Sequence, residues 1–264
     1  MTELGYVADV AEREFRTVLR TPLLLAVGLG YVLLVGGIGW LGGTGAYLAL
    51  VLDLLTPVEL LVPVLSFAVG YRALLGDRES GELETIRTYP ITGHWYVVGV
   101  YLGRAVVVLG LVLLSFVLAG SVVPTSDTAQ LSVVASHPTA DSPALYLRYA
   151  LATALFALVA LAIATLVSAA ARSTRGGLAL ATGSVVALVV GLDSALLGAV
   201  TGEHVPTTVL ALSPNSAYRS LVLELSVAPT GVAVPGGPTV LVSTAALCAW
   251  LTLALGLASR LAWR

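Results

Sequence analysis

Three carboxylates lie inside apolar stretches that are long enough to cross a membrane: Asp53, Glu59 and Asp193. A charge in hydrocarbon is costly, so each should be protonated, paired, near an interface, or turned toward a protein-lined cavity. At about 1.5 Å per helical residue, Asp53 lies ~28 Å from Arg72, and Asp193 a similar distance from Arg175, which places both near the far interface. Glu59, at ~20 Å from Arg72, is internal to its span. We expect Glu59 either to line a functional cavity or to make a structural polar contact between helices.

Catalytic roles for these acids find little support in the sequence. Intramembrane proteolysis needs two aspartates at one depth, or a serine with its base. Asp53 and Asp193 share a depth, but no protease motif surrounds either residue. The phosphate-cradling pattern GxxxxGK[ST] does not occur, so the sequence predicts no ATP site in this chain. Any energy from a nucleotide has to come from a partner.

Metal-ligating residue types are few and scattered. His137 and His204 lie between apolar stretches and leave one alternative open, a metal site shared with Asp141 or Glu203. Isolated loop histidines are more often solvated, so we assign no metal ligand. The single cysteine, Cys248, lies in an apolar stretch and offers neither an intrachain disulfide nor a thiolate cluster. With one methionine and no histidine mid-span, the sequence does not support a copper relay.

The composition is that of an integral membrane protein. Of 264 residues, 58% are hydrophobic, and the mean hydropathy is +0.97, well above the values of soluble domains. The net charge of −2 and the absence of a basic block argue against a nucleic-acid partner. A spanning helix needs about 20 mostly apolar residues. We therefore predict an all-α fold within one domain, 1–264, with six transmembrane helices at roughly 22–41, 48–71, 96–119, 145–170, 177–200 and 239–258.

A charged segment, residues 76–96, separates the second and third apolar stretches and holds four of the fifteen acids. It cannot lie in hydrocarbon and must form an aqueous loop. Asp77 or Ser80 could cap a short helix over 79–87, in which Leu83 and Ile86 share a face. We expect this pair either to dock into a groove of a partner or to pin the loop to the bilayer or to neighbouring helix ends. Thr92 should cap the third span.

Two amphipathic segments flank the spans. Residues 5–19 place apolar side chains at helical spacing opposite charged ones, which predicts a helix on the membrane surface. Residues 120–144 and 201–238 form the two longest loops. Inside the second, Ser213-Pro214 is typical of a helix start, and an amphipathic helix should follow through Tyr218.

Arginine sets the predicted orientation. Placing the N-terminus, the charged segment, the 172–175 hairpin and the C-terminus on one side gathers eleven of thirteen arginines there and leaves Arg148 and Arg219 opposite. By the positive-inside rule that side is the cytoplasm. Arg104, two to three turns inside the third span, is expected to extend back to the same surface.

Residues 77–104, DRESGELETIRTYPITGHWYVVGVYLGR, resemble the signature of permease subunits of the second type of ABC exporter. In that family an acidic Glu-x-Gly-x-Leu run, a Tyr-Pro or Leu-Pro break and a Leu-Gly pair surround the coupling helix. The resemblance implies that 1–21 is the elbow helix and 76–95 the cytoplasmic coupling loop. Within the family, the chain is most similar to the nitrous-oxide-reductase maturation permeases (NosY-like). That similarity includes an outer-loop motif of Asn215, Tyr218 and Arg219, although Pro214 precedes the asparagine here instead of following it.

The resemblance implies a homodimer in the plasma membrane, multi-pass, with cytoplasmic termini and two separate ABC ATPase subunits. This chain would then be no enzyme and would hold no cofactor, because ATP and Mg²⁺ would bind the ATPase. The output would serve copper-enzyme maturation through an extracytoplasmic maturation protein, with copper or sulfur species as cargo. The ATPase-coupling residues implied by the resemblance are Glu79, Gly81, Glu82, Leu83, Glu84, Ile86, Tyr89 and Pro90.

Three alternatives to this function remain open from the sequence. The chain could be the permease of a lipid or drug exporter. It could instead pass conformational change to an outer partner without any cargo. A channel or secondary transporter without an ATPase is a third possibility, which the elaborate charged segment disfavours.

Overall fold

The computed structural model describes residues 3–42, 46–88, 92–123, 141–194, 196, 207–234 and 236–263. All regular structure in these residues is helical, and six helices are long and apolar enough to cross a membrane. They are α2 (Pro22–Gly42), α3 (Tyr47–Gly70), α6 (Gly93–Gly120), α7 (Pro143–Ala170), α8 (Thr174–Val186) with its continuation to Ser194, and α11 (Val240–Ala262). The prediction of six spans is therefore confirmed.

The remaining helices are shorter or less apolar. The first, α1, precedes the spans, and two five-residue helices, α4 and α5, connect α3 to α6. The others follow α8. Their bounds are α1 (Glu3–Arg20), α4 (Leu75–Glu79), α5 (Glu82–Ile86), the π-helix η1 (Ala187–Gly191), the 3₁₀-helix η2 (Thr207–Leu212), α10 (Pro214–Val222), the π-helix η3 (Leu223–Val227) and the 3₁₀-helix η4 (Ala228–Thr230).

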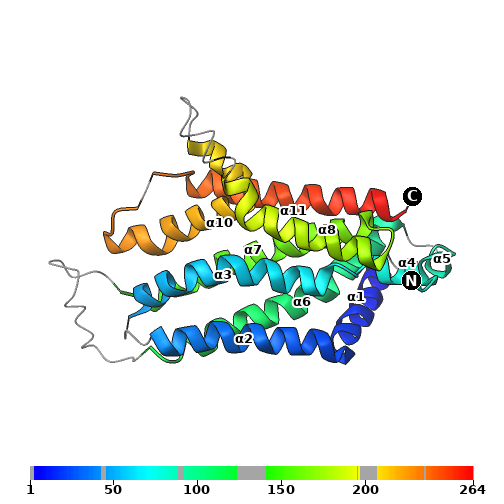
Figure 1. The fold of residues 1–264 in the computed structure, drawn as a ribbon, viewed down its shortest axis with the longest axis horizontal. Helices are drawn as coiled ribbons and strands as arrows, with labels where there is room; N and C mark the ends of the chain where they lie inside the picture. Colours follow the sequence, from blue (N-terminus) through cyan, green and yellow to red (C-terminus); the bar gives the residue numbers. More distant parts are fainter. Residues whose placement is uncertain are drawn as a thin grey trace.

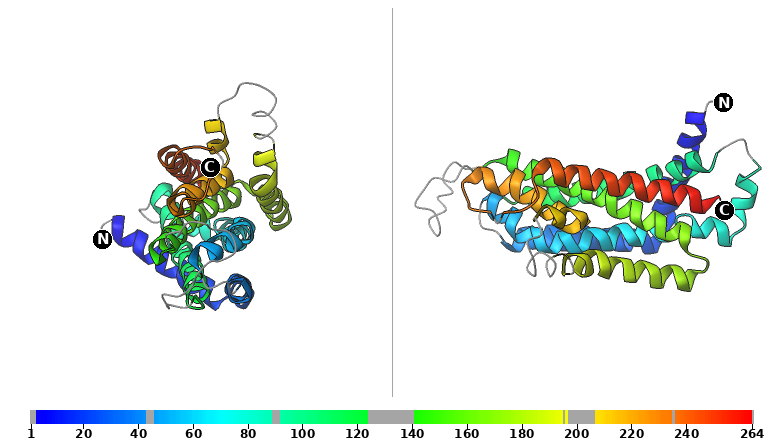
Figure 2. Two further views of the ribbon diagram at one scale, coloured as in Figure 1. Left: turned by 90° about the vertical axis from the view of Figure 1, so that its left-hand side faces the viewer. Right: turned by 90° about the horizontal axis from the view of Figure 1, so that it is seen from above.

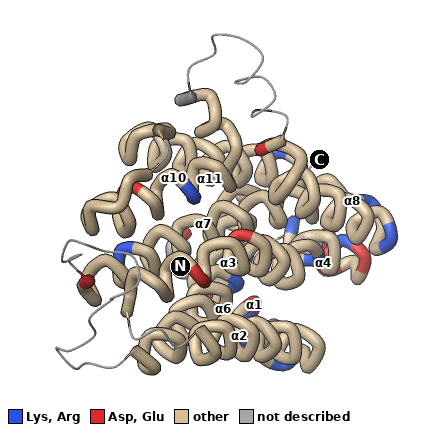
Figure 3. The backbone as a smooth tube through the Cα atoms, turned by 60° about the vertical axis from the view of Figure 1, so that its left-hand side comes forward, with Lys and Arg blue, Asp and Glu red and all other residues tan. Residues whose placement is uncertain are grey.

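The long helices lie side by side, and both ends of the chain are at the same end of the bundle as α4 and α5 (Figure 1). We call this the charged end, and the other the opposite end. Figure 3 shows charged residues gathered near α4 and the start of α8, whereas each long helix carries at most two. The predicted grouping of the N-terminus, the charged segment and the C-terminus on one side is thus confirmed.

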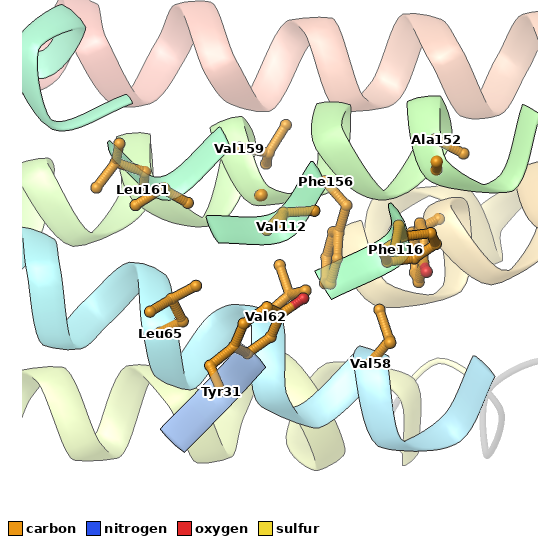
Figure 4. Packing of buried hydrophobic residues seen from close by; sticks show 14 of the residues in the cluster. Tyr31, Val58, Val62, Leu65, Val112, Phe116, Ala152, Phe156, Val159 and Leu161 are labelled. Carbon is orange, nitrogen blue, oxygen red and sulfur yellow. The ribbon is translucent and has the colours of Figure 1, made fainter. Parts of the chain in front are cut away.

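The core of the bundle lies between α3, α6 and α7. Both α3 and α7 are apolar around much of their circumference, as expected of helices surrounded by others. Val62 and Leu65 of α3 contact side chains of α6 and α7, among them Val112, Phe156 and Leu161, all of them buried (Figure 4). By contrast α8 and α11 are the least buried spans. They therefore offer the most surface to lipid or to a second chain.

Of three helix starts expected from the sequence, one is confirmed and two differ in detail. The helix that starts at Pro214 is confirmed, and the Ser213 hydroxyl accepts a hydrogen bond from the Ser216 amide. Thr92 does precede the first residue of α6, but its side chain accepts no capping hydrogen bond. The fifth span begins at Thr174, earlier than expected, and continues through η1 to Ser194.

The amphipathic prediction for the N-terminal segment is confirmed by α1, which stands at a steep angle to the bundle and packs on α6 (Figures 1 and 2). Gly99 and Gly103 of α6 form the crossing point. A Cβ on Gly99 would lie 2.8 Å from the Val10 Cβ, and one on Gly103 would overlap the Ala11 carbonyl oxygen. The two helices approach this closely only because α6 has no side chains there.

We expect Gly103→Ala to lower the free energy of unfolding by about 1–3 kcal/mol, since the added methyl forces α1 away from α6. Gly110→Ala, on the same helix, is the matched control because nothing lies within 4 Å of its added Cβ. It should be neutral or slightly stabilising, since alanine favours helix more than glycine does. Thermal unfolding in detergent compares the two variants. Equal losses of stability in the two variants would show that α1 and α6 can accommodate the added methyl group where they cross.

Candidate functional site

Four arginine and acid side chains join α1 to the charged end of the spans. Arg13 of α1 contacts Glu14 at 2.8 Å, Asp77 of α4 at 2.6 Å and Glu82 of α5 at 3.3 Å. Burial lowers the pKa of the Arg13 guanidinium, but the Asp77 carboxylate outweighs this effect and raises the pKa above its ordinary value. Asp77 also accepts a hydrogen bond from the Tyr96 hydroxyl. Arg13 is therefore a fixed positive charge between the surface helix and the α4–α5 segment.

Arg104 completes this network from α6. Its guanidinium contacts Glu14 at 2.8 Å and donates to the carbonyl oxygen of Val69 near the end of α3. Both side chains of the pair are nearly inaccessible, at 9% and 3% exposed. The expectation that Arg104 extends to the surface is therefore wrong. The buried carboxylate of Glu14 lies within its reach, and an ion pair satisfies the charge without exposing it to water.

The charged segment forms two helices instead of the single predicted helix over 79–87. α4 ends at Glu79 and α5 begins at Glu82, with Ser80 and Gly81 between them. Gly81 has φ 78°, in the left-handed region that glycine adopts without strain. Neither Asp77 nor Ser80 caps a helix from 79 to 87, because Asp77 lies inside α4 and Ser80 follows its last residue.

Leu83 does not present its side chain to solvent. It is 4% exposed and belongs to a cluster with Leu74, Tyr96 and Ala258, against which Ile86 also packs. Of the two expectations for this pair, pinning to neighbouring helix ends matches the structure, and docking of Leu83 into a partner's groove does not. Its hydrophobic side chain holds α5 against α6, α11 and the end of α7 instead.

The solvent-facing side of α5 is polar. Glu82, Glu84 and Thr85 are exposed. Glu79, at the end of α4, accepts a hydrogen bond from the Thr174 hydroxyl at 2.6 Å and contacts Arg72 at 3.3 Å. The predicted coupling residues thus divide into an acidic exposed face and a buried anchor. Tyr89 and Pro90 lie outside the described residues.

Two arginines of the charged segment hold the ends of other spans. Arg78 donates to the carbonyl oxygens of Ala169 and Ala171 at the end of α7, at 3.2 and 2.9 Å. Arg87 donates to the carbonyl oxygen of Ala262 at the end of α11, at 3.3 Å. Unpaired carbonyls at helix C-termini favour positive charge. The α4–α5 segment is therefore bonded to α7 and α11 as well as to α1.

The opposite end brings together residues far apart in the sequence. Glu59, 5% exposed in α3, accepts from the Arg219 Nε of α10 at 2.7 Å. Asp193 accepts from the Asn215 amide at 2.8 Å and from the Ser216 hydroxyl at 2.7 Å. Two of the three intramembrane acids are thus paired with the predicted outer-loop motif. For Glu59 the structure shows a polar contact between helices.

The other residues expected at this end do not join these pairs. The Tyr218 hydroxyl lies 2.8 Å from the Thr153 hydroxyl, and its ring stacks on Phe156. Asp53 is exposed and lies next to Gly42. Tyr218 therefore fixes α10 against α7, while Asp53 belongs to the rim of the bundle.

The ABC-2 family transporter protein family matches residues 55–262, which include α4, α5 and the outer helix α10. The chain belongs to this family. It is also 29% identical over 273 residues to a "Probable ABC transporter permease protein NosY" of Pseudomonas aeruginosa, covering 97% of this chain and 95% of that protein. A protein of the same name from Stutzerimonas stutzeri is 28% identical over 120 residues, 43% of this chain and 44% of that protein. This is therefore a NosY-like ABC-2 permease.

No group of three or more His, Cys, Asp or Glu side chains gathers in the described part of the permease. Cys248 is exposed on α11, and His94 lies at the charged end, with its Nδ1 3.5 Å from the Ser259 hydroxyl. His137 and His204, the open alternative for a metal site, lie outside the described residues.

Three contacts at the charged end of the permease were not anticipated from the sequence. These are the bonds of Arg13 to Asp77, of Arg78 to the end of α7, and of Arg87 to the end of α11. Each arginine lies in a segment already predicted to be at the charged end. For Arg78 and Arg87 the available signal was that cations are favoured at helix C-termini, but the sequence did not show which helix each would contact.

Proposed function

We propose that this chain is the membrane-spanning subunit of an ABC transporter that couples ATP hydrolysis in a separate ATPase subunit to movement of its spans. The observation that carries the proposal is the α4–α5 segment. It presents exposed acids at one end of the bundle, while Leu83, Arg78 and Arg87 bond it to the ends of several spans. A partner that displaced α5 would therefore displace those spans as well. In this proposal α1 is the elbow helix and α4–α5 the coupling helix.

We further propose that the output reaches the opposite end through α11 and α10. Trp250 of α11 donates from its indole Nε1 to the carbonyl oxygen of Leu212 at 3.0 Å, directly before α10. α10 is in turn bonded to α3 by Arg219 and Glu59. A chain of helices held by directed contacts thus joins the two ends of the bundle. A homodimer, with α8 and α11 as the least covered spans, fits this arrangement.

The process served is proposed from similarity. Two proteins named as probable NosY permeases resemble this chain, one of them over 97% of its length. We propose a role in maturation of a copper enzyme, nitrous oxide reductase, with an extracytoplasmic protein as partner. Within the described residues, the absence of a metal-binding group favours conformational output over transfer of copper through this chain. ATP-dependent cargo movement in vesicles distinguishes export from such cargo-free output.

We expect Glu84→Arg to abolish co-purification of the ATPase while leaving the fold unchanged, because Glu84 is exposed on α5. Reversing a charge at the edge of an interface makes the electrostatic potentials of the two partners repel each other and slows their association. Glu12→Arg, on the exposed side of α1, is the matched control and should retain the ATPase. Affinity purification followed by measurement of ATP hydrolysis provides the readout. Full ATPase recovery with the Glu84 variant would refute docking at α5.

We propose that the charged end is cytoplasmic, following the positive-inside rule. Single cysteines placed at Ser173 and Thr208, both exposed and at opposite ends, test this in a Cys248→Ser background. An impermeant thiol reagent applied to intact cells should label the cysteine at 208 and not that at 173. The reverse pattern would invert the orientation.

A further inference from the structure

A cavity of about 860 Å³ lies at the charged end, between the helices on either side of α3. Figure 2 shows α3 between α2 and α8, and the cavity is lined by all three of these helices together with α1 and α4. Its size is toward the upper limit of typical ligand sites, about 300–1,000 Å³. The coupling and the outer-loop contacts described above do not account for it.

The cavity lining changes character along the bundle. Apolar side chains line the part within the spans, among them Val27 of α2, Phe67 of α3 and Val185 of α8. Charged and hydroxyl groups line the part at the charged end, including Arg72, Asp77 and Glu82. Such a division suits an amphiphile with its headgroup at the surface and its tail among the helices.

The depth of the cavity matches one leaflet of a membrane. Its deepest lining residue on α8 is Val186, twelve residues beyond Thr174, the first residue of that helix. Twelve helical residues span about 18 Å, close to half of a hydrocarbon core of about 30 Å. The occupant is therefore expected to come from the leaflet on the side of the charged end.

The charged side chains that line the cavity indicate which kind of headgroup would bind there. Three arginines and three acids contribute, so the lining has no net charge: Arg13, Arg72, Arg104, Glu14, Asp77 and Glu82. All of these side chains except Arg72 bond to one another as described above, and Arg72 pairs with Glu79. Arg72 and Glu82 keep hydrogen-bonding capacity, because each has one described ion pair, at 3.3 Å, and they are 49% and 60% exposed. Arg72 and Glu82 thus present one partly exposed cation and one partly exposed anion, a combination that fits a zwitterion.

We propose that this cavity binds an aminophospholipid, with the phosphate at Arg72 and the primary ammonium near Glu82 and Asp77. An arginine fork suits phosphate, and an ammonium can donate three hydrogen bonds to carboxylates. A second copy of the chain is the other possible occupant. It would bring apolar spanning side chains against Arg72 and Glu82 and leave both charges facing an apolar surface, which is unfavourable.

The test uses the full-length permease with the subunits that co-purify, stripped of lipid and titrated in mild detergent. Phosphatidylethanolamine, phosphatidylglycerol and phosphatidylcholine are added separately, and bound lipid is counted by native mass spectrometry. We expect phosphatidylethanolamine to bind about tenfold more tightly than the others, the effect of one charge-assisted hydrogen bond. Phosphatidylglycerol lacks the cation, and the methylated amine of phosphatidylcholine cannot donate.

Matched variants locate the site. Thr182→Trp fills the cavity from α8, and Arg72→Gln removes the phosphate partner; each should weaken phosphatidylethanolamine binding about tenfold. Leu180→Trp and Arg175→Gln change residues that do not line the cavity and should leave binding unchanged. If the tryptophan variant fails to fold, phosphatidylethanolamine binding by Arg72→Gln is sufficient to test the site. Equal binding of all three lipids, or unchanged binding by Arg72→Gln, would overturn the proposal, as would crosslinking between two copies at residue 182 without bound lipid.

Discussion

Glu14→Leu is expected to lower the free energy of unfolding of this permease by about 3–5 kcal/mol, because it leaves the Arg104 charge buried without its acid. The remaining partner of Arg104 is the Val69 carbonyl oxygen, which cannot neutralise a positive charge. Loss of Glu14 also removes the contact, within α1, that helps to orient the Arg13 side chain. We expect α1 to detach from α6 in the variant. Denaturant titration in detergent, followed by circular dichroism, measures the loss.

Glu12→Leu is the matched control, two residues away on the same helix. Glu12 pairs with Arg16 in an exposed i,i+4 arrangement, which contributes only about 0.3–0.5 kcal/mol. The double variant Glu14→Leu/Arg104→Met should recover much of the lost stability, because two apolar groups then replace a buried ion pair. If Glu14→Leu were no more harmful than Glu12→Leu, the buried pair would have no part in holding α1.

Arg219→Ala is expected to lower the free energy of unfolding by about 2–4 kcal/mol, since it leaves the buried Glu59 carboxylate unpaired. The estimate is below that for a wholly buried pair because the Arg219 side chain is 48% exposed. Among the described residues, the ion pair of Arg219 with Glu59 also links α10 to α3. We therefore expect the variant to uncouple ATP hydrolysis from output at the opposite end while the ATPase still binds α5. Thermal unfolding and ATPase assays with the reconstituted complex measure the two effects separately.

Arg148→Ala tests whether any arginine at the opposite end would give the same result. Arg148 is exposed, and among the described residues it donates to the Leu225 carbonyl oxygen alone, at 3.3 Å. Its loss should change stability by less than about 1 kcal/mol. Glu59→Gln/Arg219→Gln removes both charges and should be milder than Arg219→Ala. Equal losses for Arg148→Ala and Arg219→Ala would show that the Glu59 pair has no special role.

The spans, the start of α10 and the grouping of the chain ends were predictable from the sequence because they depend on local properties. Apolar runs of about 20 residues located the six spanning helices. Ser213-Pro214 marked the start of α10, since a hydroxyl followed by proline satisfies the first turn of a helix. The distribution of arginine grouped both described ends of the chain with α4 and α5. Each of these signals lies within a few residues of the feature that it predicts.

The charged segment shows where local signals fail. Its acids and hydrophobic pair predicted one exposed helix over 79–87, but the chain turns at Gly81 and forms two. A glycine in the middle of a short helical pattern is compatible with either outcome. Burial of Leu83 decides between them, because α5 can cover the ends of α6, α7 and α11 only after this turn. That surface exists only in the assembled bundle.

The sequence by itself determined that Glu59, Asp193 and Arg104 each required a partner or an interface, since an isolated charge in hydrocarbon is too costly. Only the tertiary structure decided which partners they have: Arg219 from α10, Asn215 and Ser216 from the same helix, and Glu14 from α1. Glu59 and Arg219 are 160 positions apart, and Glu14 and Arg104 are 90 apart. Local periodicity sets the depth of a charge in the membrane. The packing of the helices sets which opposite charge lies at the same depth and on a facing side.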